Sequence, residues 1–362
     1  MTRTAILKCT TAVAVASMTA ALPAQAQDEA QVHGEDAGVR VERLLDRPII
    51  TPDLHPSIGV NIQGPSLIRV PDWVENALGA YYLYFADHKG HYIRLAYADD
   101  LPGPWTIHPP GSLQIADSHF LTEPPEVPPD VAARLRASQE RRGVPMSHDG
   151  LFEATTPHIA SPDVHVDDAN RRIVMYFHGL DGVSTQVTRV ATSPDGIHFE
   201  ARPERLGRTY MRAFGHDGYT FAMSMPGQFY RSRDPLGGFE EGPLLFNPDM
   251  RHAALLKRGD TLLVFWTEVG EAPERIKLSR IDLSGDWMTW TETPGVEVLR
   301  PERDWEGADA PLEPSVRSTA YGHVNQLRDP AVFEDAASGR VFLLYAVAGE
   351  SGIAIAEIHL AE

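Results

Sequence analysis

The segment His158–Gly179, HIASPDVHVDDANRRIVMYFHG, predicts two β-strands joined by a tight turn. Polar and apolar residues alternate from Ser161 to Val166, and an apolar run covers Ile173–His178 after the turn at Asp167-Asp168. Titratable side chains lie where the first strand begins and where the second ends. Weaker copies of the pattern recur in the rest of the sequence, which indicates that this segment is one unit of a repeat.

Five copies of the pattern can be aligned, each with strand-like pieces in the same order and turn residues between them. They span residues 62–107, 161–200, 210–240, 251–292 and 328–358. Five such units predict an all-β fold, a five-bladed β-propeller. A β-sandwich is the competing architecture, but it does not explain why every unit shares one internal order.

The fifth copy lacks its last strand, and we expect a strand near Ile49–Ile50 to close the ring. Arg40–Asp46 is expected to form a short helical turn. Residues 114–157 form an insertion between blades 1 and 2 that is too long for a plain loop, with a helix predicted from Val131 to Gly143. The insertion is either a lid over a site or a packing element. Residues 40–362 are therefore expected to form a single domain.

Residues 1–26 have the features of a secretory signal peptide. Arg3 and Lys8 precede an apolar run, and Ala24-Gln25-Ala26 offers a cleavage site. The alternative, an anchor helix, needs about 20 apolar residues to span a bilayer, and this run is shorter. Residues 27–39 are acidic and lack large apolar side chains, which predicts disorder. The expected location is the periplasm or the extracellular medium.

Charge and cysteine content exclude several classes of function. The net charge is −18, and removing residues 1–26 makes it −20, because they carry two bases and no acid. Such a charge disfavours nucleic acid and anionic membrane as partners. The one cysteine lies in the predicted signal peptide, so thiol catalysis and cysteine-bound metals are not expected in the mature protein.

The fifth copy carries a motif with a known counterpart. Arg328-Asp329-Pro330 opens a strand that ends at Asp335, and a turn at Gly339 leads into the apolar strand Val341–Tyr345. This pattern resembles the family 43 glycoside hydrolases and their five-bladed relatives. The resemblance implies that the Asp-Pro aspartates line the central cavity and that some of them are catalytic.

The aspartate position can be carried to the other copies. It falls on Gly64 in blade 1, Ser161 in blade 2 and His252 in blade 4, and on Tyr210 or Arg212 in blade 3. Only Asp329 keeps the carboxylate. The sequence therefore departs from the family pattern, and the missing carboxylates must come from elsewhere if the protein is a hydrolase.

Strand geometry suggests replacements. Side chains two residues apart share a face of a strand, so Asp163 and His165 should face the central channel with Ser161. The second strand of each blade returns to the mouth where the first strand begins. Its end residues are Asp87 and His88, His178, Ser224, Glu268 and Ala346.

These arguments name two groups of candidates. The catalytic candidates are Asp163, Glu268, Asp329, His178 and His252. The substrate-binding candidates are His158, His165, Asn61, Gln63, Asp87, His88, Arg212, Arg251 and Arg328. The alternative for each is structural: Asp163 could bond backbone amides, Asp329 could pair with Arg328, and the histidines could be satisfied core residues.

The residue types point to carbohydrate chemistry. Glycoside hydrolysis needs one protonated and one ionised carboxyl group, and a histidine can act as the proton donor. An arginine suits the carboxylate of a uronic acid. The leading prediction is a secreted glycosidase acting on oligosaccharide or polysaccharide. The alternatives are a polysaccharide lyase acting on a uronate-containing glycan and a non-catalytic sugar-binding propeller. No cofactor is required, although the channel leaves room for calcium or another metal ion.

Overall fold

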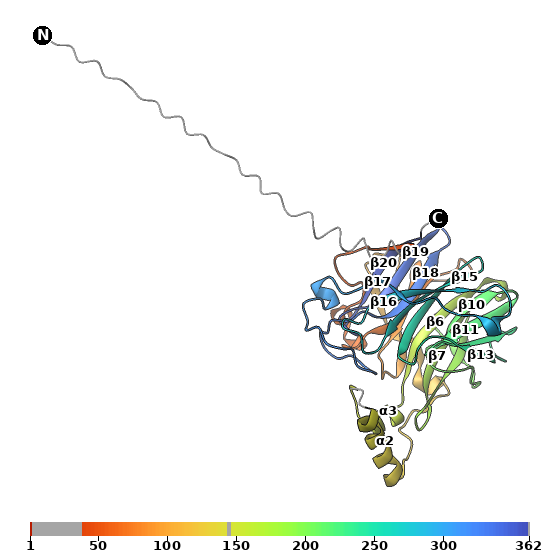
Figure 1. The fold of residues 1–362 in the computed structure, drawn as a ribbon. Helices are drawn as coiled ribbons and strands as arrows, with labels where there is room; N and C mark the ends of the chain where they lie inside the picture. Colours follow the sequence, from red (N-terminus) through yellow and green to blue (C-terminus); the bar gives the residue numbers. More distant parts are fainter. Residues whose placement is uncertain (2–37, 143–145, 361–362) are drawn as a thin grey trace.

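The computed structural model describes residues 1, 38–142 and 146–360, and it shows five four-stranded antiparallel sheets (Figure 1). The predicted all-β five-bladed propeller is confirmed. The predicted signal peptide and most of the acidic segment 27–39 lie outside the described residues.

The strands of blades 1 to 5, in order from the channel outward, are β2 (Gln63–Arg69), β3 (Tyr81–Ala86), β4 (Tyr92–Ala98) and β5 (Thr106–Gln114); β6 (Ile159–Asp167), β7 (Arg172–Gly182), β8 (Thr185–Ser193) and β9 (Glu200–Ala201); β10 (Arg212–His216), β11 (Tyr219–Ser224), β12 (Gln228–Ser232) and β13 (Glu240–Leu244); β14 (Met250–Arg258), β15 (Thr261–Glu268), β16 (Ile276–Asp282) and β17 (Val296–Leu299); β18 (Arg328–Asp335), β19 (Arg340–Ala346), β20 (Ile353–Leu360) and β1 (Val39–Arg43).

The first strands of the five sheets surround a central channel. Strand β2 packs against both β6 and β18, and β14 packs against both β10 and β18. We call the end of the channel where these five strands begin the mouth, and the end where they finish the far end. Every innermost strand therefore contributes its first residues to the mouth and its last residues to the far end.

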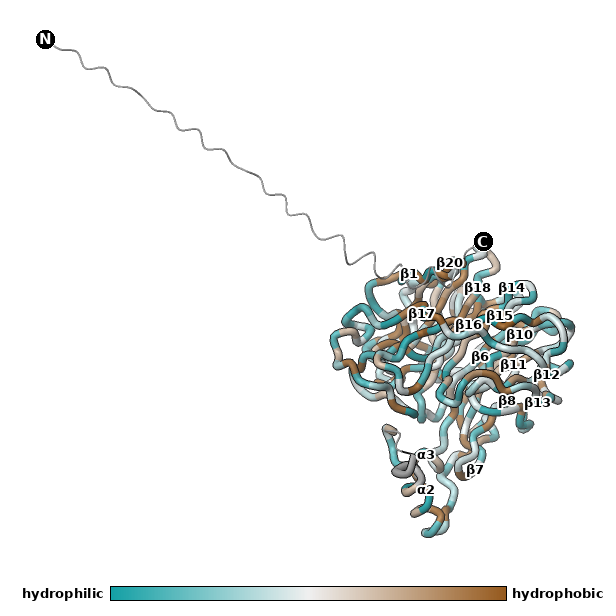
Figure 2. Tube along the Cα trace, viewed as in Figure 1, coloured by the Kyte–Doolittle hydropathy of each residue, from teal (hydrophilic) through white to brown (hydrophobic). Residues whose placement is uncertain are grey.

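The hydrophobic core is divided among the interfaces between blades. Five buried clusters exist, one at each interface; the cluster between blades 1 and 2, for example, contains Tyr84 from β3 and Met175 from β7. A sheet with a neighbour on each face buries both faces, so second strands such as YYLYFA in β3 are apolar throughout. Figure 2 shows brown, hydrophobic stretches along the strands and more teal in the outer loops.

The strand that closes the ring differs from the prediction. Strand β1 pairs antiparallel with β20, from Val39 opposite Leu360 to Arg43 opposite Ala356. Val39 and Val41 face the core between blades 4 and 5, which explains the strand and rules out the predicted helical turn. Ile50 makes only an isolated bridge with Ile353, so the prediction that Ile49–Ile50 closes the ring was wrong.

The positions predicted for several outer strands were also wrong. In blade 4 the predicted strand Trp287–Glu292 begins with a 3-10 helix, and the fourth strand is β17. The helix forms because the Asp286 side chain accepts a hydrogen bond from the amide of Met288, while Trp287 and Trp290 fill the interface between blades 3 and 4. In blades 1 and 3 the fourth strands, β5 and β13, begin several residues later than expected.

The segment between β5 and β6 contains two helices, α2 (Pro129–Arg142) and α3 (Gly150–Thr155), which project from one end of the propeller in Figure 1. The Asp149 side chain caps α3 by accepting a hydrogen bond from the amide of Phe152. Within the described residues, no helix is both long and apolar enough to cross a membrane. The remaining helices of the described residues are single 3-10 turns: η1 (Pro52–Leu54), η2 (Pro56–Ile58), η3 (Ile115–Asp117), η4 (Asp168–Asn170), η5 (Trp287–Thr289) and η6 (Asp304–Glu306).

Candidate active site at the mouth of the channel

Five equivalent residues at the mouth share one unusual backbone conformation. Gly64, Ser161, Tyr210, His252 and Asp329 have φ values of +63°, +51°, +59°, +44° and +49°. These are the positions that the alignment of the blades brings together, and in blade 3 the structure selects Tyr210 over Arg212. Four of the five carry a side chain in a region that glycine normally occupies, at a cost of about 1–3 kcal/mol each. Strain of this kind is concentrated at functional sites.

The left-handed residues also interrupt the pairing of the innermost strands. The register between first and second strands shifts at Gln63/Ser66, Ala160/Asp163, Arg251/Ala253 and Arg328/Ala331. A bulge redirects side chains and breaks the simple alternation of faces. The innermost strands are therefore irregular at the mouth and regular toward the far end.

Asp329 is the one member of this ring of five residues that has a carboxylate. Its Oδ1 accepts a hydrogen bond of 2.9 Å from the Tyr210 hydroxyl and lies 3.5 Å from Nδ1 of His252. The rings of Tyr210 and His252 are stacked, with centroids 5.0 Å apart. The other oxygen of Asp329, Oδ2, is buried and has no hydrogen-bond partner among the described residues. Asp329 thus has one oxygen held in place and one buried oxygen without a partner among the described residues.

Burial and a second carboxylate set the protonation of Asp329. Removal from water, followed by the negative charge of Glu350, raises the pKa of Asp329 to about 7. Burial alone would also raise the pKa of Glu350, but His88, Arg328 and Asn61 outweigh it and hold that pKa below its usual range. Two neighbouring carboxyl groups with opposite shifts form the arrangement expected of an acid and an ionised partner.

Glu350 is bound on every side. Its Oε1 accepts a 2.8 Å hydrogen bond from Nη1 of Arg328 and lies 3.3 Å from Nδ1 of His88, while its Oε2 accepts a 2.7 Å hydrogen bond from Nδ2 of Asn61. The Oδ1 of Asn61 accepts a hydrogen bond from the amide of His88. The predicted substrate-binding residues Asn61, His88 and Arg328 therefore hold a carboxylate of the protein.

Two buried arginines and two buried glutamates form a continuous charge network beneath the mouth. Arg251 donates to both oxygens of Glu274, Nε of Arg328 lies 3.4 Å from Glu274, and Arg328 binds Glu350. All four residues are at most 2% exposed. Buried charges of this kind persist only when each is paired. The positive charge of Arg251 and Arg328 is therefore already neutralised within the protein.

Two histidines of blade 2 lie together near the same end. The rings of His158 and His178 meet edge to face, with centroids 5.9 Å apart. Burial lowers the pKa of His158 to about 3 and that of His178 well below its ordinary value, so both imidazoles are neutral. His158 is tied to the carbonyl of Thr156, whereas Nδ1 of His178 is buried and has no hydrogen-bond partner in the described part of the protein.

Arg212 lies across the channel between the mouth and the far end. Its Nε and Nη1 donate to the carbonyls of Ala253 in blade 4 and of Ser161 and Pro162 in blade 2. Its guanidinium lies 4.1 Å from the ring centroid of Tyr210. Arg212 thereby ties three blades together and supports the ring that carries Tyr210.

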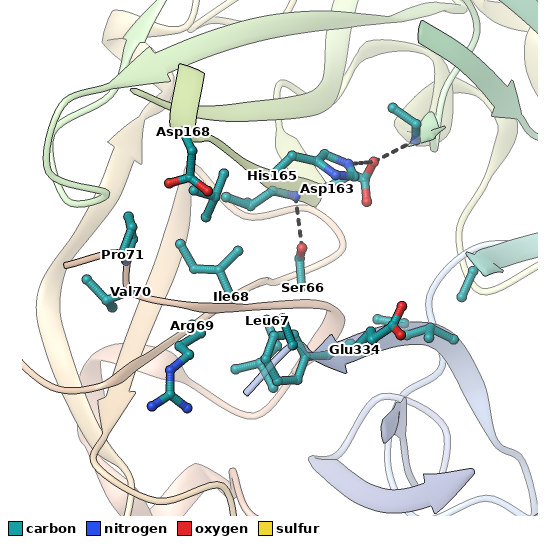
Figure 3. Close-up of a pocket in the computed structure, with 18 of the residues that line it drawn as sticks. Ser66, Leu67, Ile68, Arg69, Val70, Pro71, Asp163, His165, Asp168 and Glu334 are labelled. Atoms are coloured by element: carbon teal, nitrogen blue, oxygen red, sulfur yellow. Dashed lines mark hydrogen bonds and ion pairs between the residues drawn. The ribbon is translucent and has the colours of Figure 1, made fainter. Parts of the chain in front are cut away.

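Asp163 and His165 face the channel as predicted, but they line a cavity at the far end rather than the mouth. The Asp163 Oδ2 lies 2.7 Å from Nε2 of His165 and accepts a hydrogen bond from the amide of Ala213 (Figure 3). The prediction that Asp163 belongs to the mouth was wrong, because a strand advances about 3.3 Å per residue and Asp163 therefore lies deeper in the channel than Ser161.

Glu268 does not join the mouth cluster, which we define as Tyr210, His252, Arg328, Asp329 and Glu350. It ends β15, and its carboxylate binds Lys277 and Asn247. The prediction for Glu268 was wrong because the end of a second strand lies farther from the channel axis than the start of a first strand. Gln63 lies at the mouth, where its Oε1 is 3.5 Å from Oγ of Ser161, and Asp87 lies 3.5 Å from Arg94 of β4.

Glu350 and Glu274 were missed by the sequence argument. Both follow the second strand of their blade, in the connection to the third strand, so they reach the mouth from a loop. The corresponding connection in blade 1 supplied the candidates Asp87 and His88. Examining the same connection in every blade would have identified both glutamates.

No group of three or more histidine, cysteine, aspartate or glutamate side chains within residues 38–142 and 146–360 is arranged to hold a metal ion.

Solved structures share this fold. They include BT0996 in a complex with RGII (TM-score 0.53, 11% identity, covering 91% of this protein and 94% of BT0996). An endo-1,4-β-xylanase from Bacteroides thetaiotaomicron matches with a TM-score of 0.51 and 12% identity over 82% of this protein and 89% of the xylanase. CoXyl43, a family 43 β-xylosidase/α-arabinofuranosidase from a compost metagenome in complex with xylotriose, matches with a TM-score of 0.50 and 13% identity over 88% and 94% of the two proteins.

The sequence comparisons identify a nearer relative. No family model matches the sequence. The uncharacterized protein R118 of Acanthamoeba polyphaga mimivirus is 37% identical over 326 residues, which cover 83% of this protein and 84% of R118. The protein therefore belongs to the same family as R118, and it has the five-bladed β-propeller fold of the family 43 glycoside hydrolases.

Proposed function

We propose that the protein is a glycoside hydrolase that acts on an oligosaccharide at the mouth of the channel, with Asp329 as the general acid. One observation carries this proposal: a buried carboxyl group with a pKa raised to about 7 and one oxygen without a partner among the described residues, next to an ionised carboxylate. A glycosidase acid must be protonated near neutral pH and free to give up its proton.

The roles of the neighbouring groups follow from their charges. Asp329 would transfer its proton to the glycosidic oxygen as the bond to the anomeric carbon breaks. Glu350 stays ionised. Its negative charge keeps Asp329 protonated and stabilises the positive charge that develops on the sugar ring. Both of its carboxylate oxygens are engaged by Arg328, His88 and Asn61, so we assign Glu350 an electrostatic role and not that of a nucleophile.

The two neutral histidines are poorly suited to activating water. Burial lowers the pKa of His178 and that of His252 well below their ordinary values, so both imidazoles are weak bases. Nδ1 of His252 also lies 3.5 Å from the acid itself, whereas acid and base in glycosidases are about 5–10 Å apart. We therefore propose that water adds to the anomeric carbon after the bond has broken, and that the proton it releases restores the carboxyl group of Asp329.

The lyase alternative has less support. Elimination from a uronate needs a cation for the sugar carboxylate. Arg251 and Arg328 are bound to Glu274 and Glu350, and the guanidinium of Arg212, which has no acidic partner, is buried and held by backbone carbonyls. It also needs a base, and burial with the negative charge of Asp329 raises the pKa of Tyr210 well above its ordinary value. A tyrosine that holds its proton so firmly is a poor base.

The insertion between blades 1 and 2 would form one wall of the substrate site. Nζ of Lys89, beside His88, lies 2.8 Å from Glu153 of α3, and Glu153 also accepts a hydrogen bond from Ser318. Met146 pairs with Arg317 in an isolated bridge. These contacts tie the insertion to loops of blades 1 and 5 at the mouth.

Export completes the proposal. Residues 1–26 have the sequence pattern of a cleaved signal peptide, which suits an enzyme that meets glycans outside the cytoplasm. Amino-terminal sequencing of protein recovered from the medium or periplasm should begin near Gln27. Protein that keeps Met1 and stays inside the cell would contradict the export proposal without affecting the proposed reaction.

The reaction is tested with a panel of oligosaccharides that includes xylotriose, the ligand of CoXyl43. Hydrolysis produces new reducing ends with no absorbance from an unsaturated uronate. Appearance of that absorbance would replace hydrolysis with elimination. Saturable binding of a saccharide at the mouth with no product would replace both reactions with a binding function.

A further inference from the structure

The far end of the channel holds a cavity that the proposed hydrolase reaction does not use. Its volume is about 810 Å³, within the range of about 300–1,000 Å³ that is typical of small-molecule sites. The later residues of β2, β6, β14 and β18 line it, together with Arg212 and Ala213 of β10. Asp329, His252 and Glu350 are not among the lining residues, so the cavity is separate from the mouth cluster.

One wall of the cavity carries a fixed polar pair. Asp163 is held by the amide of Ala213 and by His165, and both contacts use Oδ2. The other carboxylate oxygen, Oδ1, and the other ring nitrogen of His165, Nδ1, have no hydrogen-bond partner among the described residues. The side chain of His165 is 42% exposed even though it lines the channel. The pair therefore presents one acceptor and one ring nitrogen to the cavity.

The remaining wall is largely apolar. Leu67, Leu255, Val332 and Phe333 line it, and Trp73 lies at the rim, where its Nε1 donates a 2.8 Å hydrogen bond to Asp168. Figure 3 shows Asp163 and His165 on one side of the cavity, with Ser66 and Leu67 between them and Arg69. The cavity thus combines a hydrogen-bonding wall with an apolar wall and an aromatic rim.

Several charges around the cavity already have partners. Arg69 lies 3.4 Å from Asp335, and Glu334 lies 3.0 Å from Arg258. The guanidinium of Arg212 has no acidic partner; backbone carbonyls hold it, and its buried Nη2 has no hydrogen-bond partner among the described residues. A ligand with several hydroxyl groups and an apolar ring face matches both walls. A neutral sugar ring has that combination.

We propose that this far-end cavity is a second saccharide site, which binds a neutral sugar unit through Asp163 and His165 and stacks it against Trp73. The residues that carry this inference differ from those of the proposed reaction. The site can therefore exist whether or not the mouth hydrolyses glycosides. In a hydrolase, such a site would hold part of a long substrate or a released product.

The test uses protein-observed NMR and calorimetry to measure binding of xylotriose, D-xylose and D-galactose to the full-length protein. We use Asp329→Asn as the background, so that no turnover occurs. His165→Gln and Asp163→Asn should each weaken the far-end affinity about tenfold or more, because each removes a hydrogen-bonding group from the wall of the cavity. The imidazole resonances of His165 should shift as the sugar is added.

Val332→Trp provides a second variant in case the polar substitutions disturb the fold. Val332 is half-buried and lines the cavity, so a tryptophan there fills the space and leaves Asp163 and His165 in place. It should abolish far-end binding, and the melting temperature of the variant checks that the fold is retained. Sugar affinity that is unchanged in all three variants, or the absence of any sugar binding at His165, would overturn the proposal.

Discussion

The two ends of the channel are built from the same five strands but differ in almost every physical property. At the mouth, Asp329 and Glu350 are 1% exposed and surrounded by paired charges. At the far end, Asp163 and His165 border a cavity of about 810 Å³. Burial raises the pKa of Asp329, whereas His165 and Arg212 outweigh burial and lower the pKa of Asp163. Carboxylates on the same channel thus become an acid in one place and half of an ion pair in another.

The difference comes from the backbone at the strand starts. Left-handed residues at the mouth redirect side chains and bring loop residues such as Glu350 into contact with the strands. Beyond the bulges the strands are regular, and their side chains line a cavity. The following predictions test whether the chemistry of the mouth depends on the close packing of its buried side chains.

The largest expected effect is on activity. Asp329→Asn keeps the shape of the side chain while it removes the acidic proton, so the turnover number should fall about 10²- to 10⁴-fold. The measurement is kcat on the best substrate from the panel, with the melting temperature as a check on folding. Asp217→Asn, at an aspartate whose side chain is 85% exposed, is the matched control and should leave kcat unchanged. Full activity in Asp329→Asn would remove Asp329 from the mechanism.

A large effect on stability is expected from the buried charge network. Arg328→Met leaves Glu350 and Glu274 without their shared cation, so the free energy of unfolding should fall by about 3–5 kcal/mol. Arg340→Met is the surface counterpart, because Arg340 binds Glu357 with a side chain that is 48% exposed. Its cost should stay below about 1 kcal/mol. Urea unfolding of both variants gives the comparison, and equal costs would mean that burial does not distinguish them.

A smaller effect is expected at Gly64, the one glycine in the left-handed ring. A Cβ at this position would lie 3.0 Å from the Cα of Ser161, in a conformation that already costs alanine about 1–2 kcal/mol. Gly259→Ala is the control, since Gly259 has a φ of +56° and nothing within 4 Å of an added Cβ. Gly64→Ala should destabilise the fold more than Gly259→Ala and should also lower kcat. A loss of stability without any loss of kcat would separate the ring from the reaction.

The last prediction concerns pH. The folded-state pKa of Asp329 is raised, so its contribution to stability is complete below its unfolded pKa of about 4 and is lost as pH rises through about 7. The Asp329→Asn variant has no ionisable group at this position, so it does not lose this contribution to stability as pH rises. The free energy of unfolding of Asp329→Asn, minus that of the unaltered protein, should therefore increase between pH 4 and pH 7 and then level off. A difference that stays flat would show that Asp329 is not protonated in the folded protein.

Much of the fold could be predicted from the sequence, because the inner strands carry a strong signal. Strands such as β3 and β19 are buried on both faces and appear as apolar runs. The outer strands are half-exposed, so their polar sequences resemble loops, and β17 and β1 were placed wrongly. Pairing between β1 and β20 joins opposite ends of the sequence, and no local pattern reveals it.

The site was harder to predict for a geometric reason. Asp329 could be identified because an Asp-Pro motif marks it. Asp163 was assigned to the mouth because it shares a face of the strand with Ser161, but it lies two residues farther along the strand and therefore deeper in the channel. Glu350 lies in the AGESG turn, which carries no motif, and it stands out only when the same connection is compared in every blade. The residue that tunes the acid was thus harder to find than the acid itself.

The pairing of β1 with β20 also bears on how the protein is made. Val39 is synthesised long before Leu360, yet these residues are neighbours in the finished sheet. Blades 1 to 4 can form as their strands emerge from the ribosome, but blade 5 has to wait, because three of its four strands, β18, β19 and β20, follow all the strands of the other blades. Asp329 and Glu350 both belong to blade 5. The order of synthesis therefore means that the proposed acid and its partner take shape after the other four blades.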